Sequence, residues 1–379
     1  MDMPTGRLHL TIESCWGRLD DLLGFAARAN PHRAFLFLSK VLGKHYPVTP
    51  ANMEVTHHAL ADLVPRARGP VVFIGMAETA TGLGQGVFEA WLKANPGAEA
   101  LYMQTTRYRV DVTQCLTFEE SHCHAPRLFL HLPSDPSGQK LLKAAGHVVL
   151  VDDELSTGNT FVNLVRVLRS VMPGLADVHL ATIADFMGST RRRELTQYMG
   201  LPCSVGALLR GAWSFEANGN AVALAAAQCV EGQEVRLSDT GYGRLGRPCA
   251  LGLPSSLVET LIQEQVSGTT LILGTGEFMH AAFVLGRALE QRGVDVRIQA
   301  TTRSPILSWG AVSRVLSVPD PYEEGIANYL YNMRPGQYAR VLICHETAPN
   351  AALFELACML DGRLIYFRPN DDVQEIPVR

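Results

Sequence analysis

Two adjacent carboxylates followed by a small hydroxylated turn are the feature of this sequence most suited to chemistry. The stretch VVLVDDELSTGNT places Asp152 and Asp153 directly after a short apolar run. If that run forms a parallel strand, the residues at its carboxyl end face the ligand crevice of the sheet. A carboxylate at that position can accept hydrogen bonds from vicinal hydroxyls, such as those of a ribose. We therefore expect Asp152 and Asp153 to bind a sugar.

The turn that follows these acids suits an anion. Ser156, Thr157, Gly158, Asn159 and Thr160 lead into TFVNLVRVLRSVM, which has helical spacing. Backbone N–H groups and hydroxyls at a helix N-terminus can hold a phosphate, and glycine lets the backbone approach it closely. The alternative is a helix cap with a solvated flank. That alternative explains Ser156 or Thr157, but it does not explain two carboxylates at the strand edge.

The elements that would position these residues have an alternating pattern. From Val71 onward, buried strands (VVFIG, AEALYMQTT, HVVLV, ADVHLATIAD) alternate with helical segments, and the alternation resumes at TTLILG. Such alternation predicts parallel sheets. We further expect helices over residues 17–43 and in PYEEGIANYLYNM, a Gly-rich turn at ATGLGQG, and irregular structure over residues 106–138. SDTGYGRLGRPCALGLPSS is rich in Gly and Pro, which predicts a linker or crossing segment.

The two α/β parts resemble each other. Each has a strand, a Gly-x-x-Glu turn, a helix, a second strand and then Thr-Thr-Arg. The glutamates are Glu78 and Glu277, and the arginines are Arg107 and Arg303. Any two β-α-β units look alike to some degree, but the shared Thr-Thr-Arg favours a structural repeat.

Composition excludes several classes of protein. The chain has 379 residues, 47% hydrophobic and 18% charged, with a formal net charge of −4. It has no overall attraction for nucleic acid and no apolar run long enough to span a membrane. Its eight cysteines form no CxxC pair, which favours reduced thiols and a cytoplasmic location. His122, Cys123 and His124 could ligate a metal, but no second ligand cluster has convincing spacing, so we favour a loop that touches substrate.

The pattern of apolar strand, two acids and Ser-Thr-Gly-x-Thr resembles the phosphoribosyl-pyrophosphate (PRPP) motif of type I phosphoribosyltransferases. The resemblance implies that Asp152 and Asp153 bind the ribose hydroxyls and that Ser156 to Thr160 bind the 5′-phosphate. Ser156 stands where the 6-oxopurine branch carries an Asp that works near purine N7. An orotate-like or unusual base is therefore favoured over hypoxanthine or guanine.

The resemblance also implies a pyrophosphate loop, here Gly75, Met76, Ala77, Glu78 and Thr79, with Mg²⁺ held by Asp152, Asp153 and the pyrophosphate. Glu78 departs from this expectation, because a carboxylate repels pyrophosphate unless a metal or a basic partner intervenes. The alternative for this loop is a plain strand-to-helix turn. Arg107 and Arg109 lie where the family has a mobile catalytic loop, and guanidinium groups there could neutralise the leaving pyrophosphate.

The C-terminal part resembles the TRSP domain, which follows orotate-phosphoribosyltransferase-like domains in gene clusters for tellurite resistance and stress response. The residues that carry this resemblance are Thr302-Arg303-Ser304-Pro305, SKVLGKHYPV, FEESHCHAP and PYEEGIANYLYN. The resemblance implies companion ATP-grasp and hydrolase proteins. Arg303 and Ser304 are a candidate anion site of the second domain, although a structural corner explains them nearly as well.

We therefore predict a type I phosphoribosyltransferase-like parallel sheet flanked by helices, plus a second Rossmann-like α/β domain. Residues 1–235 would form the phosphoribosyltransferase domain, with an N-terminal hood over about 1–65, and residues 236–379 the TRSP-type domain. The sequence leaves the oligomeric state open, a homodimer included.

The predicted reaction transfers the ribose 5-phosphate of PRPP to a nitrogen base or base-like acceptor and releases pyrophosphate, within the biosynthesis of a nucleoside-like metabolite. Asp152, Asp153, Arg107 and Arg109 are the candidate catalytic residues. Two alternatives remain. The first is a catalytically silent PRPP- or nucleotide-binding regulator, which Glu78 in the predicted pyrophosphate loop favours slightly. The second is a nucleoside hydrolase or phosphorylase.

Overall fold

The N-terminal part of the chain is built on a mostly parallel sheet. The computed structural model describes all residues except 29–32, 111–113, 120–126, 219–240, 369–371 and 379. Within the described residues this sheet has seven strands in the order β1-β2-β11-β10-β9-β5-β6. The strands from β11 to β6 are parallel, and β2 and β1 add an antiparallel edge. Their bounds are β1 Asp2–Met3, β2 Gly6–Cys15, β5 Val71–Gly75, β6 Ala100–Gln104, β9 His147–Leu155, β10 Asp177–Asp185 and β11 Cys203–Ala217.

The central strands of this sheet are apolar runs, and such runs are stable here because helices cover both faces of the sheet. All five residues of β5 are buried, as are all five of β6, which is typical of strands covered on both faces. Among the described residues, the helices that follow strands of this sheet are α3 Thr81–Ala94, α4 Pro136–Ala144, α5 Asn159–Leu168 and α6 Gly188–Met199. The expected turn at ATGLGQG is wrong, because it lies mostly in α3. A Cβ on Gly84 would lie 2.5 Å from the Cα of Gly75, so these glycines allow α3 to pack close to β5.

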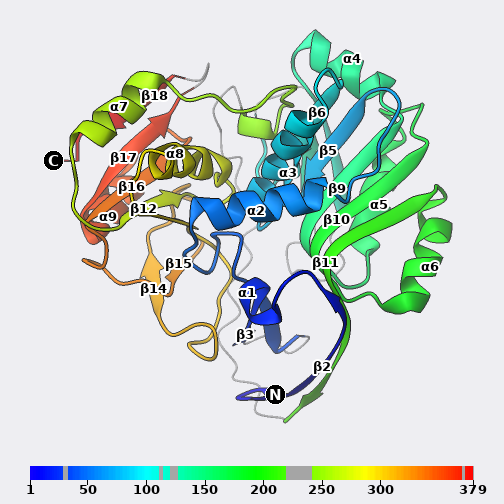
Figure 1. The fold of residues 1–379 in the computed structure, drawn as a ribbon, viewed down its shortest axis with the longest axis horizontal. Coiled ribbons are helices and arrows are strands. Elements are labelled where there is room, and N and C mark those ends of the chain that lie inside the picture. Colours follow the sequence, from blue (N-terminus) through cyan, green and yellow to red (C-terminus); the bar gives the residue numbers. More distant parts are fainter. Residues whose placement is uncertain (29–32, 111–113, 120–126, 219–240, 369–371, 379) are drawn as a thin grey trace.

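A second sheet of five strands is formed by the described C-terminal residues, in the order β13-β12-β16-β17-β18. All neighbours are parallel except β17 and β18. The elements are α7 Ser255–Gln263, β12 Thr270–Gly274, α8 His280–Glu290, β13 Val296–Ala300, β16 Arg340–His345, α9 Ala351–Leu360, β17 Gly362–Phe367 and β18 Val373–Ile376. The predicted fold class, a helix-flanked parallel sheet plus a second α/β unit, is confirmed (Figure 1).

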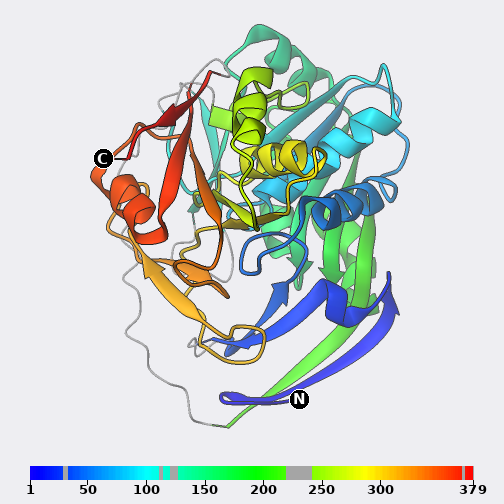
Figure 2. The ribbon, with the colours of Figure 1, turned by 60° about the vertical axis from the view of Figure 1, so that its left-hand side comes forward.

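The helix predicted over residues 17–43 is wrong. Among the described residues of this range only α1 (Leu19–Leu22) is helical, and β3 (Leu23–Ala27) pairs with β4 (Phe35–Ser39) in an antiparallel arrangement. Tertiary packing overrides the helical spacing, because the hairpin buries Ala26 and Leu38 against the buried Ile306 of the C-terminal part. This hood segment continues into α2 (Pro50–Ala61), which packs against both α3 and α8 (Figure 2).

Two further expectations fail for local reasons. Residues 106–138 are not wholly irregular, since β7 (Cys115–Glu119) and β8 (Arg127–His131) form a hairpin. PYEEGIANYLYNM is not a helix, since β15 (Asn328–Tyr331) pairs there with β14 (Val315–Val318). The Asp320 carboxylate accepts the N–H groups of Tyr322 and Glu324 and so folds a turn in place of the helix.

The described part of the connection between the two parts begins at Gly241. The boundary predicted between residues 235 and 236 lies outside the described residues, so the domain limits stay a prediction. Beyond it, a short helix at Gly241–Gly243 and Arg244 lie at the junction, and Arg247 bridges to Tyr102 of β6. In the described part of the chain, no helix is long and apolar enough to cross a membrane.

Candidate functional site

Three of the predicted site segments meet at one edge of the first sheet. β5 lies between β9 and β6, and neighbouring strands of a sheet are about 4.8 Å apart, so the loops that follow these three strands leave the same edge next to one another. The Met76 amide donates to the Val151 carbonyl at 3.0 Å, and the Thr105 amide donates to the Gly75 carbonyl at 3.0 Å. The acids, the predicted pyrophosphate loop and the Thr-Thr-Arg segment are therefore neighbours.

Asp152 and Asp153 lie within β9 rather than after it, because the strand continues to Leu155. Both are half-buried, and the Asp153 amide donates to Asp152 Oδ1 at 2.9 Å. Burial raises the pKa of Asp153, against the opposing effects of a hydrogen bond with Asp152 and the charge of Arg33. Arg33, from the hood segment, donates to both oxygens of the neighbouring Glu154 at 2.8 and 2.9 Å. A third acid and a hood arginine thus belong to the same edge.

The predicted phosphate turn opens α5. Gly158 has φ +72°, and a Cβ there would lie 3.0 Å from Leu195 Cδ1, so the turn requires glycine for both conformation and space. Arg191 of α6 donates to the Thr157 carbonyl at 2.7 Å and to Asn159 Oδ1 at 2.6 Å. The turn therefore combines a helix N-terminus with an adjacent guanidinium, and both favour an anion.

The predicted pyrophosphate loop, Gly75 to Thr79, has a basic partner. Lys44, with only 1% of its side chain exposed, lies 2.8 Å from Glu78 Oε1 and donates to the Gly276 carbonyl at 2.6 Å. Burial alone would raise the pKa of Glu78, but Lys44, Arg303 and Arg107 outweigh it and lower this pKa to about 2. The Glu78 carboxylate is therefore ionised, and the positive charge of Lys44 balances its negative charge. Its charge, which is unexpected from the sequence, is explained by a lysine of the hood segment.

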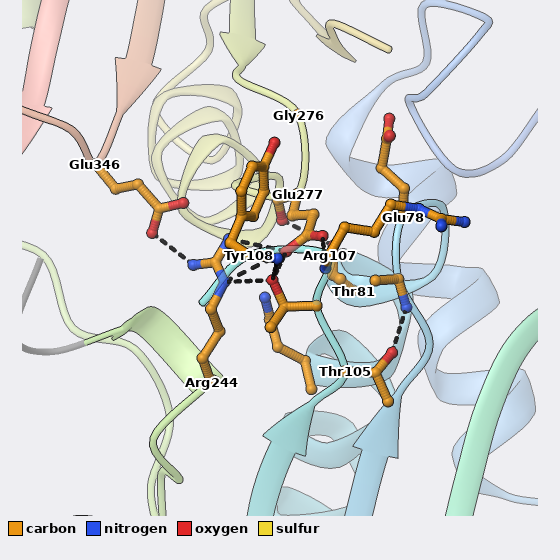
Figure 3. Close-up of polar contacts among 12 residues, drawn as sticks. Glu78, Thr81, Thr105, Arg107, Tyr108, Arg244, Gly276, Glu277 and Glu346 are labelled. Carbon is orange, nitrogen blue, oxygen red and sulfur yellow. Dashed lines mark hydrogen bonds and ion pairs between the residues drawn. The ribbon is translucent and has the colours of Figure 1, made fainter. Parts of the chain in front are cut away.

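Arg107 and Arg109 occupy different surroundings. The Arg107 amide donates to Glu277 Oε1 at 2.9 Å, and its side chain extends from the same loop cluster as Glu78 (Figure 3). The Arg109 guanidinium carbon lies 5.2 Å from the centre of the Phe129 ring, on the β7–β8 hairpin. The charge of Arg107 acts on the predicted pyrophosphate loop, whereas Arg109 packs beside the hairpin.

The repeat predicted between the two parts is present in their hydrogen bonding. The Ala77 amide donates to Thr105 Oγ1 at 2.8 Å, and in the second sheet the Gly276 amide donates to Thr301 Oγ1 at 2.8 Å. The carboxyl edges of the two sheets face each other. Thr81 Oγ1 donates to the Glu277 carbonyl at 2.8 Å across this junction.

A buried charge network fills the junction. The Arg244 guanidinium lies 3.0 Å from Glu277 Oε2 and 2.7 Å from Glu346 Oε2, and none of these three side chains is more than 1% exposed (Figure 3). Thr106 Oγ1 donates to Glu277 Oε2 at 2.6 Å, and Tyr322 donates to Glu346 Oε1 at 2.9 Å. The network connects the loop after β6 to the loops after β12 and β16.

Arg303 and Ser304 form part of the same junction. The Arg303 guanidinium contacts the Tyr108 hydroxyl and the Glu324 carboxylate, and it lies 4.8 Å from the centre of the Tyr108 ring. The Ser304 amide donates to Thr302 Oγ1 at 3.3 Å, and the Ser304 carbonyl accepts the Tyr331 hydroxyl. Arg303 thus points from the C-terminal part towards the loop that carries Arg107.

The described residues include no group of three or more His, Cys, Asp and Glu placed to hold a metal ion on their own. His122, Cys123 and His124 lie outside the described residues. A cavity of about 400 Å³ opens near Thr269, Asp295 and Arg340, at the amino ends of strands in the second sheet. None of the predicted site residues lines it, so geometry and charge at the carboxyl edges, rather than cavity size, define the candidate site.

Sequence reasoning missed the residues that complete the site from distant segments. They are Arg33, Lys44, Arg191 and Arg244, together with Glu277, whose carboxylate accepts hydrogen bonds at the junction. Lys44 lies in SKVLGKHYPV, a stretch that the resemblance to TRSP-containing proteins had singled out, and Glu277 lies in the repeat. No local pattern marks the other three.

Comparison with known families and structures gives two matches on the chain. A family model described as "Phosphoribosyl transferase" matches residues 22–212, about half of the chain. A second, described as "TRSP domain C terminus to PRTase_2", matches residues 254–360. A search of the curated proteins gave no match.

The chain is also similar to solved structures at low identity. Adenine phosphoribosyl transferase from Trypanosoma brucei is 11% identical, with 49% of this chain and 76% of that chain covered and a TM-score of 0.33. A phosphoribosyltransferase from Corynebacterium diphtheriae is 13% identical, with 50% and 90% covered and a TM-score of 0.33. Orotate phosphoribosyltransferase from Mycobacterium tuberculosis is 13% identical, with 48% and 88% covered and a TM-score of 0.28.

Proposed function

The chain belongs to the phosphoribosyltransferase family, and from that premise we propose that it transfers the ribose 5-phosphate of PRPP to a nitrogen base or base-like acceptor. The family and the TRSP domain, both expected from short motifs, are confirmed. The acceptor, the biosynthesis of a nucleoside-like metabolite, and a role in tellurite resistance or stress response with ATP-grasp and hydrolase partners are parts of the proposal.

One observation carries the site assignment. The acids of β9, the turn at Ser156 to Thr160 that follows this strand and the loop at Gly75 to Thr79 lie at one edge of the sheet, where the Met76 amide donates to the Val151 carbonyl. PRPP carries three groups in sequence, a 5′-phosphate, a ribose and a pyrophosphate, and these segments offer a suitable partner for each. We assign the 5′-phosphate to the turn, the ribose hydroxyls to Asp152 and Asp153, and the pyrophosphate to the loop.

The chain's own residues would act mainly by position and charge. Asp152 and Asp153 orient the ribose and favour the positive charge that develops on the sugar as the bond from C1 to pyrophosphate breaks. The acceptor nitrogen attacks C1 and the electron pair leaves with pyrophosphate, so no protein nucleophile is needed. Arg107 and Arg109 are proposed to stabilise the negative charge on the departing pyrophosphate.

The donor set fits Mg²⁺ bound together with substrate. Mg²⁺ prefers oxygen ligands and is commonly held by one or two carboxylates plus substrate phosphates. Asp152 and Asp153 supply two half-buried carboxylates at the proposed ribose position. When bound, the ion would neutralise charge on the pyrophosphate oxygens.

Pyrophosphate release in the presence of PRPP, Mg²⁺ and a panel of bases, starting with orotate-like ones, tests the activity. Saturable PRPP binding without turnover for any base would favour the regulatory alternative. Free ribose formed from a nucleoside would favour the hydrolase, and ribose 1-phosphate formed from a nucleoside and phosphate would favour the phosphorylase.

Calorimetry tests the site. We expect the Asp152→Asn/Asp153→Asn variant to bind PRPP at least about tenfold more weakly, because two hydrogen bonds to charged acceptors become neutral ones. Asp295→Asn, at the opposite edge of the second sheet, is the matched control and should bind as the wild type does. Equal PRPP affinity of the double variant and the wild type would show that the assignment is wrong.

A further inference from the structure

The carboxyl edge of the second sheet is the place where a Rossmann-like domain would bind its own ligand. Here the loop after β12 is engaged by the rest of the chain. The Gly276 carbonyl accepts from Lys44, and the Thr275 carbonyl accepts from the Tyr322 hydroxyl at 3.0 Å. The Glu277 carboxylate accepts from Thr106, the Arg107 amide and Arg244. These contacts turn the edge of the second sheet into a surface that supports the first.

Arg303 is held in a fixed direction at this surface. Its guanidinium contacts the Tyr108 hydroxyl, lies 4.8 Å from the Tyr108 ring centre, and pairs with Glu324, whose side chain is 4% exposed. Tyr108 also stacks on Tyr322 of the C-terminal part, with ring centres 4.6 Å apart. The arginine is therefore placed by one residue from each part of the chain, next to the loop that begins with Arg107.

The predicted pyrophosphate loop carries a negative charge of its own, so a further cation beside it would favour a bound diphosphate. The loop itself contributes a carboxylate, Glu78, and its ion pair with Lys44 occupies the nearest cation. Arg303 is 14% exposed, and its charge together with that of Lys44 and Arg107 lowers the pKa of Glu78 against burial. A planar guanidinium can donate two parallel hydrogen bonds to phosphate oxygens.

We propose that Arg303 is a diphosphate-binding residue of the transferase site, supplied by the C-terminal domain. This inference rests on the proposed function and assigns a role to that domain: it completes the pyrophosphate subsite of the first. Arg303 of the Thr-Arg-Ser-Pro stretch then serves the first domain rather than a separate anion site of the second.

The test compares ligands that differ only in the diphosphate. The variants are Arg303→Met/Glu324→Gln, which removes both charges of the pair and leaves no unpaired buried carboxylate, and Tyr108→Phe, which removes the hydroxyl that orients Arg303. The ligands are PRPP, pyrophosphate and ribose 5-phosphate, each titrated with Mg²⁺ into the full-length protein by calorimetry. Arg297→Met, a surface arginine paired with Asp295, is the matched control.

For the double variant we expect PRPP and pyrophosphate to bind about 10- to 100-fold more weakly, the loss typical of a hydrogen bond to a charged group. Ribose 5-phosphate binding should change by less than about twofold. Tyr108→Phe should show the same selectivity with a smaller loss.

Unchanged PRPP affinity in the double variant would overturn the inference. An equal loss for all three ligands would also overturn it, because it would mean that Arg303 only holds the fold together. If the wild type binds ribose 5-phosphate and PRPP but the variants show no selectivity, the proposed function stands and this inference falls. If the wild type binds none of the three, both fall.

Discussion

Replacing Arg244 with methionine tests whether the buried network holds the two parts of the chain together. The substitution removes the cation but keeps much of the side-chain volume. It leaves the carboxylates of Glu277 and Glu346, exposed by 1% and 0%, without their charged partner. Breaking a buried ion pair in this way costs about 3–5 kcal/mol.

Arg244 forms two ion pairs, but we expect the loss of unfolding free energy to lie in the range for one pair rather than at twice that range. Glu277 keeps its hydrogen bonds from Thr106 and the Arg107 amide, and Glu346 keeps the one from Tyr322. A loss of this size is a large fraction of the roughly 5–15 kcal/mol that stabilises a typical folded protein.

The assay is urea denaturation followed by tryptophan fluorescence, at pH 7.5 and pH 5.5. Arg297→Met is the control, since its partner Asp295 is 54% exposed and such pairs contribute about 0–1 kcal/mol. An unpaired buried carboxylate takes up a proton more readily than a solvated one, which stabilises the folded variant as the pH falls. The deficit of Arg244→Met should therefore shrink at pH 5.5.

Equal destabilisation by Arg244→Met and Arg297→Met at pH 7.5 would refute the reasoning. So would a deficit that grows as the pH falls. Either result would mean that apolar packing, rather than charge, dominates the junction.

Three further predictions concern single sites. Gly158→Ala should weaken ribose 5-phosphate binding and lower the unfolding free energy by about 1 kcal/mol or more, because φ is +72° and the added Cβ meets Leu195. Calorimetry measures the binding, and urea titration measures the unfolding free energy. Arg191→Met should weaken ribose 5-phosphate binding about tenfold while leaving pyrophosphate binding nearly unchanged, since Arg191 holds the phosphate turn. Burial, helped by the charge of His280, lowers the pKa of His57 to about 3, so stability should fall as the pH drops below about 6.5, by up to about 1.4 kcal/mol per pH unit. His57→Gln should make that fall shallower by one proton, and an unchanged slope in urea titrations between pH 7 and 5 would contradict this.

Local pattern predicted the strands and the turn because both depend on neighbouring residues. Apolar runs such as VVFIG became buried parallel strands, and Gly158 adopted the left-handed conformation for which glycine is suited. The helix predicted over residues 17–43 was wrong for the opposite reason, because its structure depends on residues far away in the sequence. Residues 17–43 have helical spacing, yet most of the segment is not helical, and Ala26 and Leu38 of its hairpin pack on Ile306, far away in sequence. A sequence pattern does not contain that contact.

The partner of Glu78 illustrates the same limit within the site. The sequence shows a carboxylate where an anion is expected to bind, which weakens the transferase interpretation and favours a binding module. The structure adds Lys44 at 2.8 Å, and the charge of Arg303 from the other part of the chain acts on the same carboxylate. A carboxylate in this loop is therefore compatible with a bound anion, because residues outside the loop balance its charge.

The loop at Glu78 also explains why the two domains would be kept in one chain. Lys44 pairs with Glu78 of the first domain and donates to the Gly276 carbonyl of the second, so the hood, the loop and the C-terminal domain share one buried ammonium group. Removing the C-terminal domain would expose this group and the carboxylate edge of the network at once. The predicted pyrophosphate loop is therefore linked to the C-terminal part through Lys44 as well as through the charge of Arg303. On this basis the proposed transferase site includes the C-terminal part of the chain, whose repeat of strand, turn and Thr-Thr-Arg forms an edge that contacts the first sheet.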